Sequence, residues 1–504
     1  MYQVVIGLEI HAQIKTQSKM FCGCPQATDG LPPNTAMCPI CTGQPGTLPV
    51  LNLQALKLGI KTSLALHCRI NTESKFDRKH YFYPDLPKAY QISQYDQPIA
   101  EDGFLEIEVP DEKTGETVNR KIRIQRLHLE EDAAKLLHGA GENHAYVDFN
   151  RAGSALMEMV THPDVASPAE AKLFLQELRL ILRYLGASDA NMEKGQMRCD
   201  ANISLRPIGD TNFYTKTEVK NMNSFKAVER ALEFEIERQT KLWDAGTPPD
   251  KLSTRGWDDV KQITVLQRIK EDAADYRYFP EPDIPPLHMK TLAEEMAKKL
   301  PELPAARRAR FTNEYGLSLS DAHILTDDLN WANFTEQTFS ELYAWLRSLP
   351  DMEGLSEEQI IEKNSGKLAR LVGGYLTSKL MGLMADKHID IRTLKITPEN
   401  FAEFIALLYT NKINGANALT LLENMFDGED PTHIMEEKQL GQVEDAGLIA
   451  RAVDEVLKSC PDQVAQFKSG KTSVLQFLIG KIMKETQGRA DPGAVREALM
   501  QKIK

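Results

Sequence analysis

One short segment near the start of the chain, residues 4–14 (VVIGLEIHAQI), constrains the fold more than any other. Apolar residues alternate with the others along it, and a period of two is typical of a half-buried β-strand, whose successive side chains point to opposite faces. Glu9 and His11 therefore share one face, roughly 7 Å apart at the rise of a strand. Taken alone, the segment also fits a strand whose polar face simply meets solvent.

The same alternation recurs at residues 195–206, where Arg198 and Asp200 lie on the polar face. Between these two segments, LHLEED and ALMEMV carry acids inside apolar surroundings, and an unpaired buried charge is costly. The acids in question are Glu130, Glu131, Asp132 and Glu158. Carboxylates and a histidine from several strands, with arginine and lysine nearby, suit a Mg²⁺ ion that holds phosphate. A set of ion pairs on a large sheet is the alternative.

Four of the seven cysteines form two close pairs. Cys22 and Cys24 are separated by one residue, Cys38 and Cys41 by two, and Pro or Gly stands beside each pair. Two such tight turns are how four thiolates converge on Zn²⁺, whereas disulfides are the weaker alternative in a reducing compartment. A closed four-thiolate site has no open ligand position, so we expect a structural zinc ion that fixes a loop at about residues 20–42.

Length, hydropathy and charge limit the class of protein. A chain of 504 residues predicts two or three domains. No apolar run approaches 18 residues and the start enters a strand at once, so we expect no membrane span, no processed leader and a cytoplasmic protein. The net charge is −12, yet residues 460–504 carry eight Lys and Arg against four Asp and Glu. This basic end is a candidate phosphate-backbone contact, or else an ordinary solvated helix face.

The pattern of elements predicts an α+β body followed by an all-α arm. The first 285 or so residues mix strand and helix signals, including a hairpin whose turn falls around Lys113 to Glu116. Ser167 and Pro168 begin a capped helix that ends at Gly186. Four prolines within residues 275–287 indicate a domain edge, and strand signals nearly vanish after it.

Several common catalytic devices are absent from the sequence. It contains no GxxxxGK[ST], no GxGxxG after a strand and no GxSxG, and no cysteine has a histidine-paired context. The chain therefore has no nucleophile of its own with which to release ammonia or to form an acyl intermediate.

Long blocks of the sequence strongly resemble the GatB family, the B subunits of bacterial aspartyl/glutamyl-tRNA amidotransferases. The matching blocks include VIGLEIHAQIKTQSKMFC, KFDRKHYFYPDLPKAYQISQYDQPI, LHLEEDAAK, NRAGSALMEMVTHPD, MRCDANISLRP and DYRYFPEPDIPPL, and the basic end resembles the YqeY-like domain of that family. The resemblance spans nearly the whole chain, and blocks of this length are far more specific than a short motif.

The resemblance implies a fold and an activity. It implies a glutamine synthetase-like antiparallel-sheet cradle at residues 1–290, a helical domain at 291–410, and a YqeY-like tRNA-binding tail at 411–504. The zinc loop within the cradle rests on the cysteine spacing of this sequence, since the four cysteines are not universal in the family. Such a protein phosphorylates the side-chain carboxylate of Glu-tRNA(Gln) or Asp-tRNA(Asn) with ATP and Mg²⁺. Ammonia released by the amidase partner GatA then displaces phosphate, and the small protein GatC completes the complex.

The resemblance also implies roles for individual residues. The expected Mg²⁺ set is His11, Glu131 and Glu158, with Glu9, Glu130 and Asp200 as near neighbours. The residues associated with the ammonia path are Lys79, Lys88 and Glu131. Arg198 and Lys220 are expected to face ATP or the charge of the transition state. The lysines expected to bind tRNA are Lys468, Lys471, Lys481 and Lys484.

Two other functions fit parts of the sequence. A stand-alone ATP-dependent carboxylate–amine ligase acting on a small substrate would use the same acids, but it has no need of the helical arm and basic tail. A tRNA-binding scaffold without catalysis would use the tail, but it has no need of Glu9, His11, Glu131, Glu158 and Asp200. Binding of deacylated tRNA tests the first alternative, and release of phosphate tests the second.

Overall fold

The computed structural model describes residues 1–504 except 111–116, 139–143, 271–275, 350, 351, 353, 443–445, 470, 472, 473, 487, 488 and 504. It divides into two compact units, Met1–Leu303 and Pro304–Lys504. The division lies beyond residue 290 because helix α4 (Lys290–Ala297) packs on helix α1 (Leu53–Ala65), and its Leu292 joins the core of the first unit. The expected further boundary at residue 410 stays a prediction.

The first unit is built on a nine-stranded sheet with the order β14-β13-β12-β11-β1-β10-β7-β6-β2. Its neighbours are antiparallel except β12 and β13, which run parallel. The strands of this sheet are β1 (Tyr2–Gln13), β2 (Arg69–Ile70), β6 (Ala100–Pro110), β7 (Thr117–Glu131), β10 (Ala155–Thr161), β11 (Met197–Pro207), β12 (Thr217–Lys220), β13 (Leu252–Asp258) and β14 (Ile263–Lys270).

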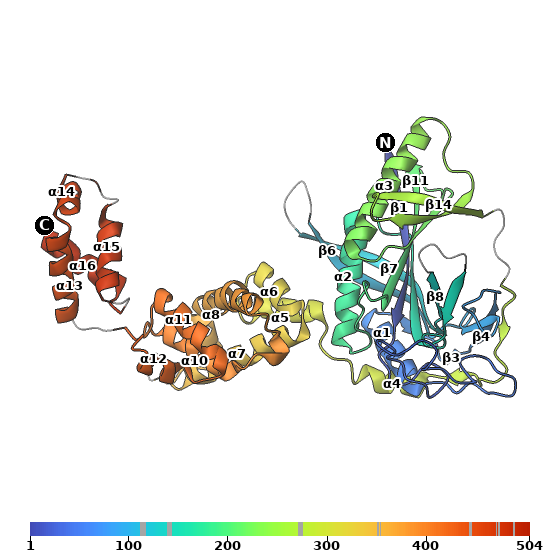
Figure 1. The fold of residues 1–504 in the computed structure, drawn as a ribbon, viewed down its shortest axis with the longest axis horizontal. Helices are drawn as coiled ribbons and strands as arrows, with labels where there is room; N and C mark the ends of the chain where they lie inside the picture. The colour runs from blue at the N-terminus through green and yellow to red at the C-terminus, as the bar shows by residue number, and fades with distance from the viewer. Residues whose placement is uncertain are drawn as a thin grey trace. The chain divides into compact units, whose positions relative to one another are not determined.

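Strand β1 lies in the middle of this sheet, and its alternation divides the two faces. Ile6, Leu8 and Ile10 are almost fully buried in the core. Helices α1, α2 (Pro168–Tyr184) and α3 (Phe225–Asp244) lie along one side of the sheet in Figure 1. The latter two begin with side-chain caps, Ser167 for α2 and Ser224 for α3, each of which satisfies a backbone N–H of the first turn.

Short strands lie along the other side of the sheet (Figure 1). They form three small sheets, β15-β4-β5, β16-β3 and β8-β9. Their bounds are β3 (Glu73–Ser74), β4 (Asp77–His80), β5 (Tyr90–Ser93), β8 (Lys135–His138), β9 (Ala145–Asp148), β15 (Phe279–Pro280) and β16 (Leu287–His288). Strand β5 lies next to β7, and Lys79 of β4 with Gln91 and Ser93 of β5 lines the same cavity as the polar face of β1.

Within its described residues, the second unit contains helices and connecting loops but no β-strand. Its α-helices are α5 (Pro304–Asn313), α6 (Leu319–Thr326), α7 (Leu329–Arg347), α8 (Glu357–Gly374), α9 (Met381–Asp386), α10 (Pro398–Tyr409), α11 (Gly415–Asn424), α12 (Pro431–Glu437), α13 (Ala446–Ser459), α14 (Pro461–Lys468), α15 (Val474–Glu485) and α16 (Pro492–Ile503). A π-helix, Tyr375–Leu380, joins α8 to α9, and 3₁₀ turns occupy Ile391–Thr393 and Met425–Asp427. Helices α13–α16 pack around a hydrophobic core of their own.

The predicted fold class is confirmed at the level of a mixed α+β body and a helical C-terminal region. Strands β6 and β7 pair antiparallel as the hairpin prediction requires, but its turn lies outside the described residues. The likeness to glutamine synthetase stays an expectation. Among the helices that the structure describes, none has the length and apolarity to span a bilayer.

Candidate functional site

Four polar residues stand side by side across the middle of the large sheet. His128 on β7 is opposite Glu158 on β10, Glu158 is opposite His11 on β1, and His11 is opposite Arg198 on β11. Directly opposite residues of antiparallel strands hold their Cβ atoms about 5 Å apart, so this register forces the side chains together. The pairing of the strands therefore places these four side chains in a row, and no ligand is needed to bring them together.

A second pair extends the row on the same face. Glu9 is opposite Asp200, two residues along from His11 and Arg198, and the expected pair of Glu9 and His11 does share one face. Together these residues line a cavity of about 490 Å³. Its acidic residues are Glu9, Glu130, Asp132, Glu158, Asp200 and Glu218. Its lysines and arginines are Lys79, Arg126, Arg198, Lys216, Lys220 and Arg268.

Glu158 lies at the centre of the acidic part of this cavity. Its Oε2 is 3.3 Å from the Nε2 atoms of both His11 and His128. Glu130 contacts the same two imidazoles, at 3.5 Å and 3.6 Å. The donor atoms form two groups, each close enough to hold one metal ion. The groups are Glu9–His11–Glu158 and His128–Glu130–Glu158, and both include Glu158.

The charges in this group stabilise one another. Burial acts to raise the pKa of Glu158, but the charge of His128 and the hydrogen bond from His11 hold it well below its usual range. Burial likewise acts to lower the pKa of His128, yet the charge of Glu158 and the hydrogen bond to Glu130 raise it to about 9. Glu9 differs, because burial and the charge of Glu158 both raise its pKa. The cluster thus keeps anionic carboxylates in a buried place, with the imidazoles as the nearest cations.

The cations of the cavity fall into two classes. Arg198 donates to Asp132 at 2.8 Å, and Lys220 pairs with Asp200, so the expected functional cations Arg198 and Lys220 both face acids within the site. Arg126 is different, because its Nε is buried without a hydrogen-bond partner among the described residues. A buried donor without an acceptor is costly, which marks Arg126 as a group prepared for an anionic ligand.

Lys79 and Lys88, both expected on the ammonia path, line different cavities. Lys79 lines the 490 Å³ cavity with its ammonium 5.0 Å from the ring centroid of Tyr276. Burial acts to lower its pKa, but the negative charges around it, that of Glu130 foremost, together raise it. Lys88 lines a second cavity of about 200 Å³ and forms a buried ion pair with Glu131.

The structure does not bring Glu131 together with His11 and Glu158. Glu131 follows Glu130 in β7, so its side chain points to the opposite face, where its Oε1 accepts a hydrogen bond from the backbone N–H of Ile92 at 3.0 Å. Glu130 stands beside the two histidines instead. The geometry thus favours Glu130 over the expected Glu131 at this position of the metal set, since the alternation of the strand separates neighbouring acids.

Sequence reasoning missed His128 and Arg126. Both lie on the cavity-lining face of β7, at positions two and four residues before Glu130. The signal is present in the sequence, because Leu127 and Leu129 alternate with His128 and Glu130 just as the apolar residues of β1 alternate with Glu9 and His11.

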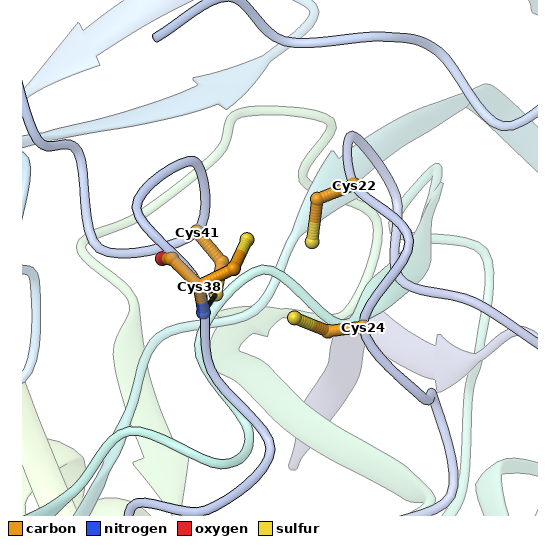
Figure 2. A group of neighbouring side chains, drawn as sticks. All are labelled: Cys22, Cys24, Cys38 and Cys41. Carbon is orange, nitrogen blue, oxygen red and sulfur yellow. Dashed lines mark hydrogen bonds between the residues drawn. The ribbon is translucent and has the colours of Figure 1, made fainter.

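The four paired cysteines converge in space, and Figure 2 shows their sulfur atoms directed toward one another. All four sulfurs lie within 4.8 Å of one another, and none is in a disulfide. A hydrogen bond from Cys22 lowers the pKa of Cys41 to about 5, whereas burial raises the pKa of Cys24 to about 11. The donor set, four thiols from two turns, fits tetrahedral Zn²⁺.

The lysines expected to bind tRNA all lie in the C-terminal region and are exposed. Lys468 ends α14, Lys471 follows it, and Lys481 and Lys484 lie on α15. Lys481 places its ammonium 5.8 Å from the ring centroid of Phe477, which is itself half exposed. Their function stays a prediction.

Comparisons with known proteins cover nearly the whole chain. Residues 4–295 match the model of the GatB/GatE catalytic domain, and residues 358–503 match that of the GatB domain. The B subunit of the aspartyl/glutamyl-tRNA(Asn/Gln) amidotransferase of Rippkaea orientalis is 44% identical over 100% of this chain and 98% of its own. Proteins of the same name from Carboxydothermus hydrogenoformans and Thermotoga maritima are also 44% identical, over 100% and 97% of this chain and 99% and 97% of their own.

Proposed function

Because the chain belongs to the GatB/GatE family of aspartyl/glutamyl-tRNA amidotransferase B subunits, we propose that it activates and amidates the side-chain carboxylate of misacylated tRNA. The reaction consumes ATP, and the substrate is Glu-tRNA(Gln), Asp-tRNA(Asn) or both. One observation carries the proposal: two potential metal groups share Glu158 inside a cavity that also holds Arg126, Arg198 and Lys220. Clustered carboxylates facing positioned cations are what phosphoryl transfer to a carboxylate requires.

The acidic group fits a divalent cation by the chemistry of its donors. Glu158 would be the shared ligand, with Glu9 and His11 on one side and His128 and Glu130 on the other. Mg²⁺ bound there would draw charge from the transferring phosphoryl group. Oxygen donors predominate in the set, which favours Mg²⁺ over the softer ions that imidazole and thiolate select.

The cations of the cavity would receive the phosphates of the nucleotide and the transferring group. Arg126 has a buried Nε without a partner among the described residues, so a phosphate oxygen would supply its missing acceptor. Asp132 holds the side chain of Arg198, and Asp200 holds that of Lys220, so both cations are oriented before the nucleotide binds. Positioned cations of this kind stabilise charge that develops in the transition state.

Phosphorylation solves the chemical difficulty of the reaction. A free carboxylate resists attack by ammonia because the leaving group would be oxide. Transfer of the phosphoryl group to the carboxylate oxygen replaces oxide with phosphate, and the ammonia nitrogen then forms the amide bond as the C–O bond to phosphate breaks. Tyr81, Tyr276 and Tyr278 line the cavity and would help to exclude water that hydrolyses the acyl phosphate.

Ammonia would come from a partner protein. The sequence offers no nucleophile of its own for glutamine hydrolysis, so an amidase, GatA, would supply ammonia, with GatC as the third member of a cytoplasmic complex. Lys88 and Glu131 would border its route, because they form a buried ion pair behind the catalytic cavity.

Zinc and the C-terminal helices would have supporting roles. Cys22, Cys24, Cys38 and Cys41 would hold a structural Zn²⁺ that fixes the loop after β1. The four exposed tail lysines would contact the phosphate backbone of tRNA.

The decisive experiment is ATP hydrolysis by the chain co-purified with its amidase partner. We expect phosphate release that requires Mg²⁺ and is stimulated by Glu-tRNA(Gln) or Asp-tRNA(Asn), with deacylated tRNA as the control. Release that is equal with acylated and deacylated tRNA would reject carboxylate activation. Stimulation by free glutamate or aspartate instead would favour a small-molecule ligase.

A further inference from the structure

The second cavity is lined by two of the four clustered cysteines and by the Lys88–Glu131 pair. Cys22, Cys41 and Gly43 line it from the cysteine loop, together with Lys88 and Glu131. Both charged side chains are buried, with 7% and 3% of their surface exposed. A buried ion pair is stable only when both partners are held in place, so the contacts that hold Lys88 decide its geometry.

Gly43 lies directly against the side chain of Lys88. A methyl group built on Gly43 would lie 2.2 Å from Cγ of Lys88 and 3.2 Å from its Cβ and Cδ. Any side chain at position 43 would therefore displace the aliphatic stem of Lys88. The backbone of Gly43 also has a φ of +69°, a conformation that favours glycine.

Backbone hydrogen bonds within the turn that carries Cys38 and Cys41 hold Gly43 in place. Its N–H donates to the carbonyl of Ile40 at 3.1 Å, and the N–H of Thr42 donates to the carbonyl of Cys38 at 3.1 Å. Gly43 thus belongs to the same tight turn as Cys38 and Cys41, whose sulfurs belong to the cluster in Figure 2. A displacement of this turn would move the surface against which Lys88 packs.

Strand β5 contributes side chains to both the second cavity and the catalytic one. Its residues alternate between the two, with Gln91 and Ser93 lining the catalytic cavity and Ile92 lining the second. The backbone N–H of Ile92 donates to Glu131, and the hydroxyl of Ser93 donates to Glu130 at 3.0 Å. The two neighbouring acids of β7 are therefore held by neighbouring residues of β5, one in each cavity.

We propose that Gly43 is a positioning residue that holds Lys88 on Glu131, and that the cysteine turn thereby controls the use of glutamine-derived ammonia. This inference rests on the proposed function, since it assigns the second cavity to the ammonia route. It predicts that the four-cysteine turn does more than stabilise a loop. Its integrity sets how efficiently each ammonia molecule released by the partner is used.

The test compares Gly43→Ala with Gly30→Ala in the intact complex. Gly30 lies in the same loop with a φ of +79°, but a methyl group there has no atom within 4 Å, so it matches the backbone strain without the contact. Two rates of amidation are measured, with glutamine and with added ammonium chloride. Zinc content and tRNA-stimulated ATP hydrolysis are measured on the same samples.

We expect Gly43→Ala to lower the amide formed per glutamine hydrolysed by about tenfold, because small misplacements of positioning groups are costly in rate. Ammonium-driven amidation, ATP hydrolysis and zinc content should match those of Gly30→Ala. Equal glutamine-driven yields in the two variants would overturn the inference. A wild-type complex without tRNA-stimulated ATP hydrolysis would instead reject the proposed function, so the two failures are distinguishable.

A stability cycle tests the contact even if Gly43→Ala folds poorly. In the Lys88→Ala background the Cγ atom that the new methyl group meets at 2.2 Å is gone, so the fall in melting temperature caused by Gly43→Ala should shrink toward that caused by Gly30→Ala. An undiminished fall in the Lys88→Ala background would show that Gly43 does not act through Lys88.

Discussion

Glu158 and Glu235 are both buried carboxylates of the first unit, yet their surroundings differ in kind. Glu235, on α3, is fully buried and accepts hydrogen bonds from Arg238 at 2.8 Å and Gln239 at 3.2 Å, with Arg255 at 3.2 Å as a further cation. Glu158 is surrounded by two histidines and two further acids, and it borders a cavity. The first carboxylate is paired with guanidinium groups that are always charged, whereas the second is paired with imidazoles, whose protons a bound metal ion would replace.

The difference separates a structural charge from a functional one. Arginines balance Glu235 at every pH at which the protein is folded, so no ligand is needed. The only cations in contact with Glu158 among the described residues are imidazoles, and Glu9 and Glu130 repel it. The pKa values of His11 and His128 are raised, so both imidazoles favour the protonated form, and a metal ion bound to the same group would replace those protons. Burial alone therefore does not identify a functional acid, whereas the identity of its partners does.

The largest expected effect follows from removing the charge of Glu158. Glu158→Gln keeps the shape but removes the donor shared by both metal groups, and we expect tRNA-stimulated ATP hydrolysis to fall by about a thousandfold. Its melting temperature should fall, but by less than that of Glu235→Gln, because the loss of repulsion from Glu9 and Glu130 partly offsets the loss of the contacts to histidine. Steady-state phosphate release and calorimetry measure the two quantities.

Glu106→Gln is the matched control, since Glu106 is an exposed carboxylate on β6 of the same sheet. It should leave both quantities unchanged. If Glu158→Gln hydrolysed ATP at the wild-type rate, or unfolded as easily as a Glu235 variant, the distinction between the two carboxylates would fail.

His11→Ala should give the next largest loss of activity, about a hundredfold. His11 contacts both Glu158 and Glu130, so its removal disturbs both acids at once. Glutamine hydrolysis by the complex should persist, because that chemistry belongs to the partner. Wild-type amidation by this variant would exclude His11 from the site.

Glu235→Gln should behave in the opposite way. Removal of one partner from a buried, hydrogen-bonded ion pair costs about 3 kcal/mol in the free energy of unfolding, and the folded variant should keep its activity. Burial acts to raise the pKa of Glu235, but hydrogen bonds from Arg238 hold it below its usual range. Its contribution to stability is thus complete above the pKa of the unfolded state and is lost as the pH falls through the lower, folded pKa.

Urea unfolding at a series of pH values measures this effect. The difference in stability between wild type and Glu235→Gln should be largest near neutral pH and should narrow as the pH falls below about 4. A difference that stayed constant down to the acid transition would show that Glu235 contributes through shape rather than charge.

Much of the catalytic face could be predicted from the sequence, but not every residue that belongs to it. Alternation in β1 and β11 places Glu9, His11 and Asp200 together, because strand register is a local consequence of the hydrophobic pattern. It does not place Lys88 on Glu131, since Lys88 comes from a loop before β5 and meets β7 only in the folded chain. Resemblance alone puts Glu131 in the metal set. The histidine two residues before Glu130 identifies which acid faces the cavity.

The extent of the first unit shows a similar limit of local pattern. Prolines at residues 275–287 interrupt regular structure, but α4 lies beyond them and buries Met296 against the core of the first unit. A local break in secondary structure therefore marks a turn of the chain, whereas the end of a domain depends on which core the next helix joins.

The smallest effect is expected for exposed charges, which complete the comparison with the buried ones. Lys468, Lys471, Lys481 and Lys484 are exposed, so replacing all four with Gln should change stability by no more than about 0.5 kcal/mol. If they contact tRNA phosphates, the variant should bind tRNA about tenfold more weakly at low salt and show a shallower dependence of affinity on salt. Replacing the same four with Arg preserves the charge and should preserve both the affinity and its salt slope. Filter binding across a salt series measures the affinity and its salt slope. A phosphate contact releases counterions when it forms, so it must appear in the slope. Equal salt slopes for the Gln and Arg variants would therefore show that these lysines only solvate the helical surface.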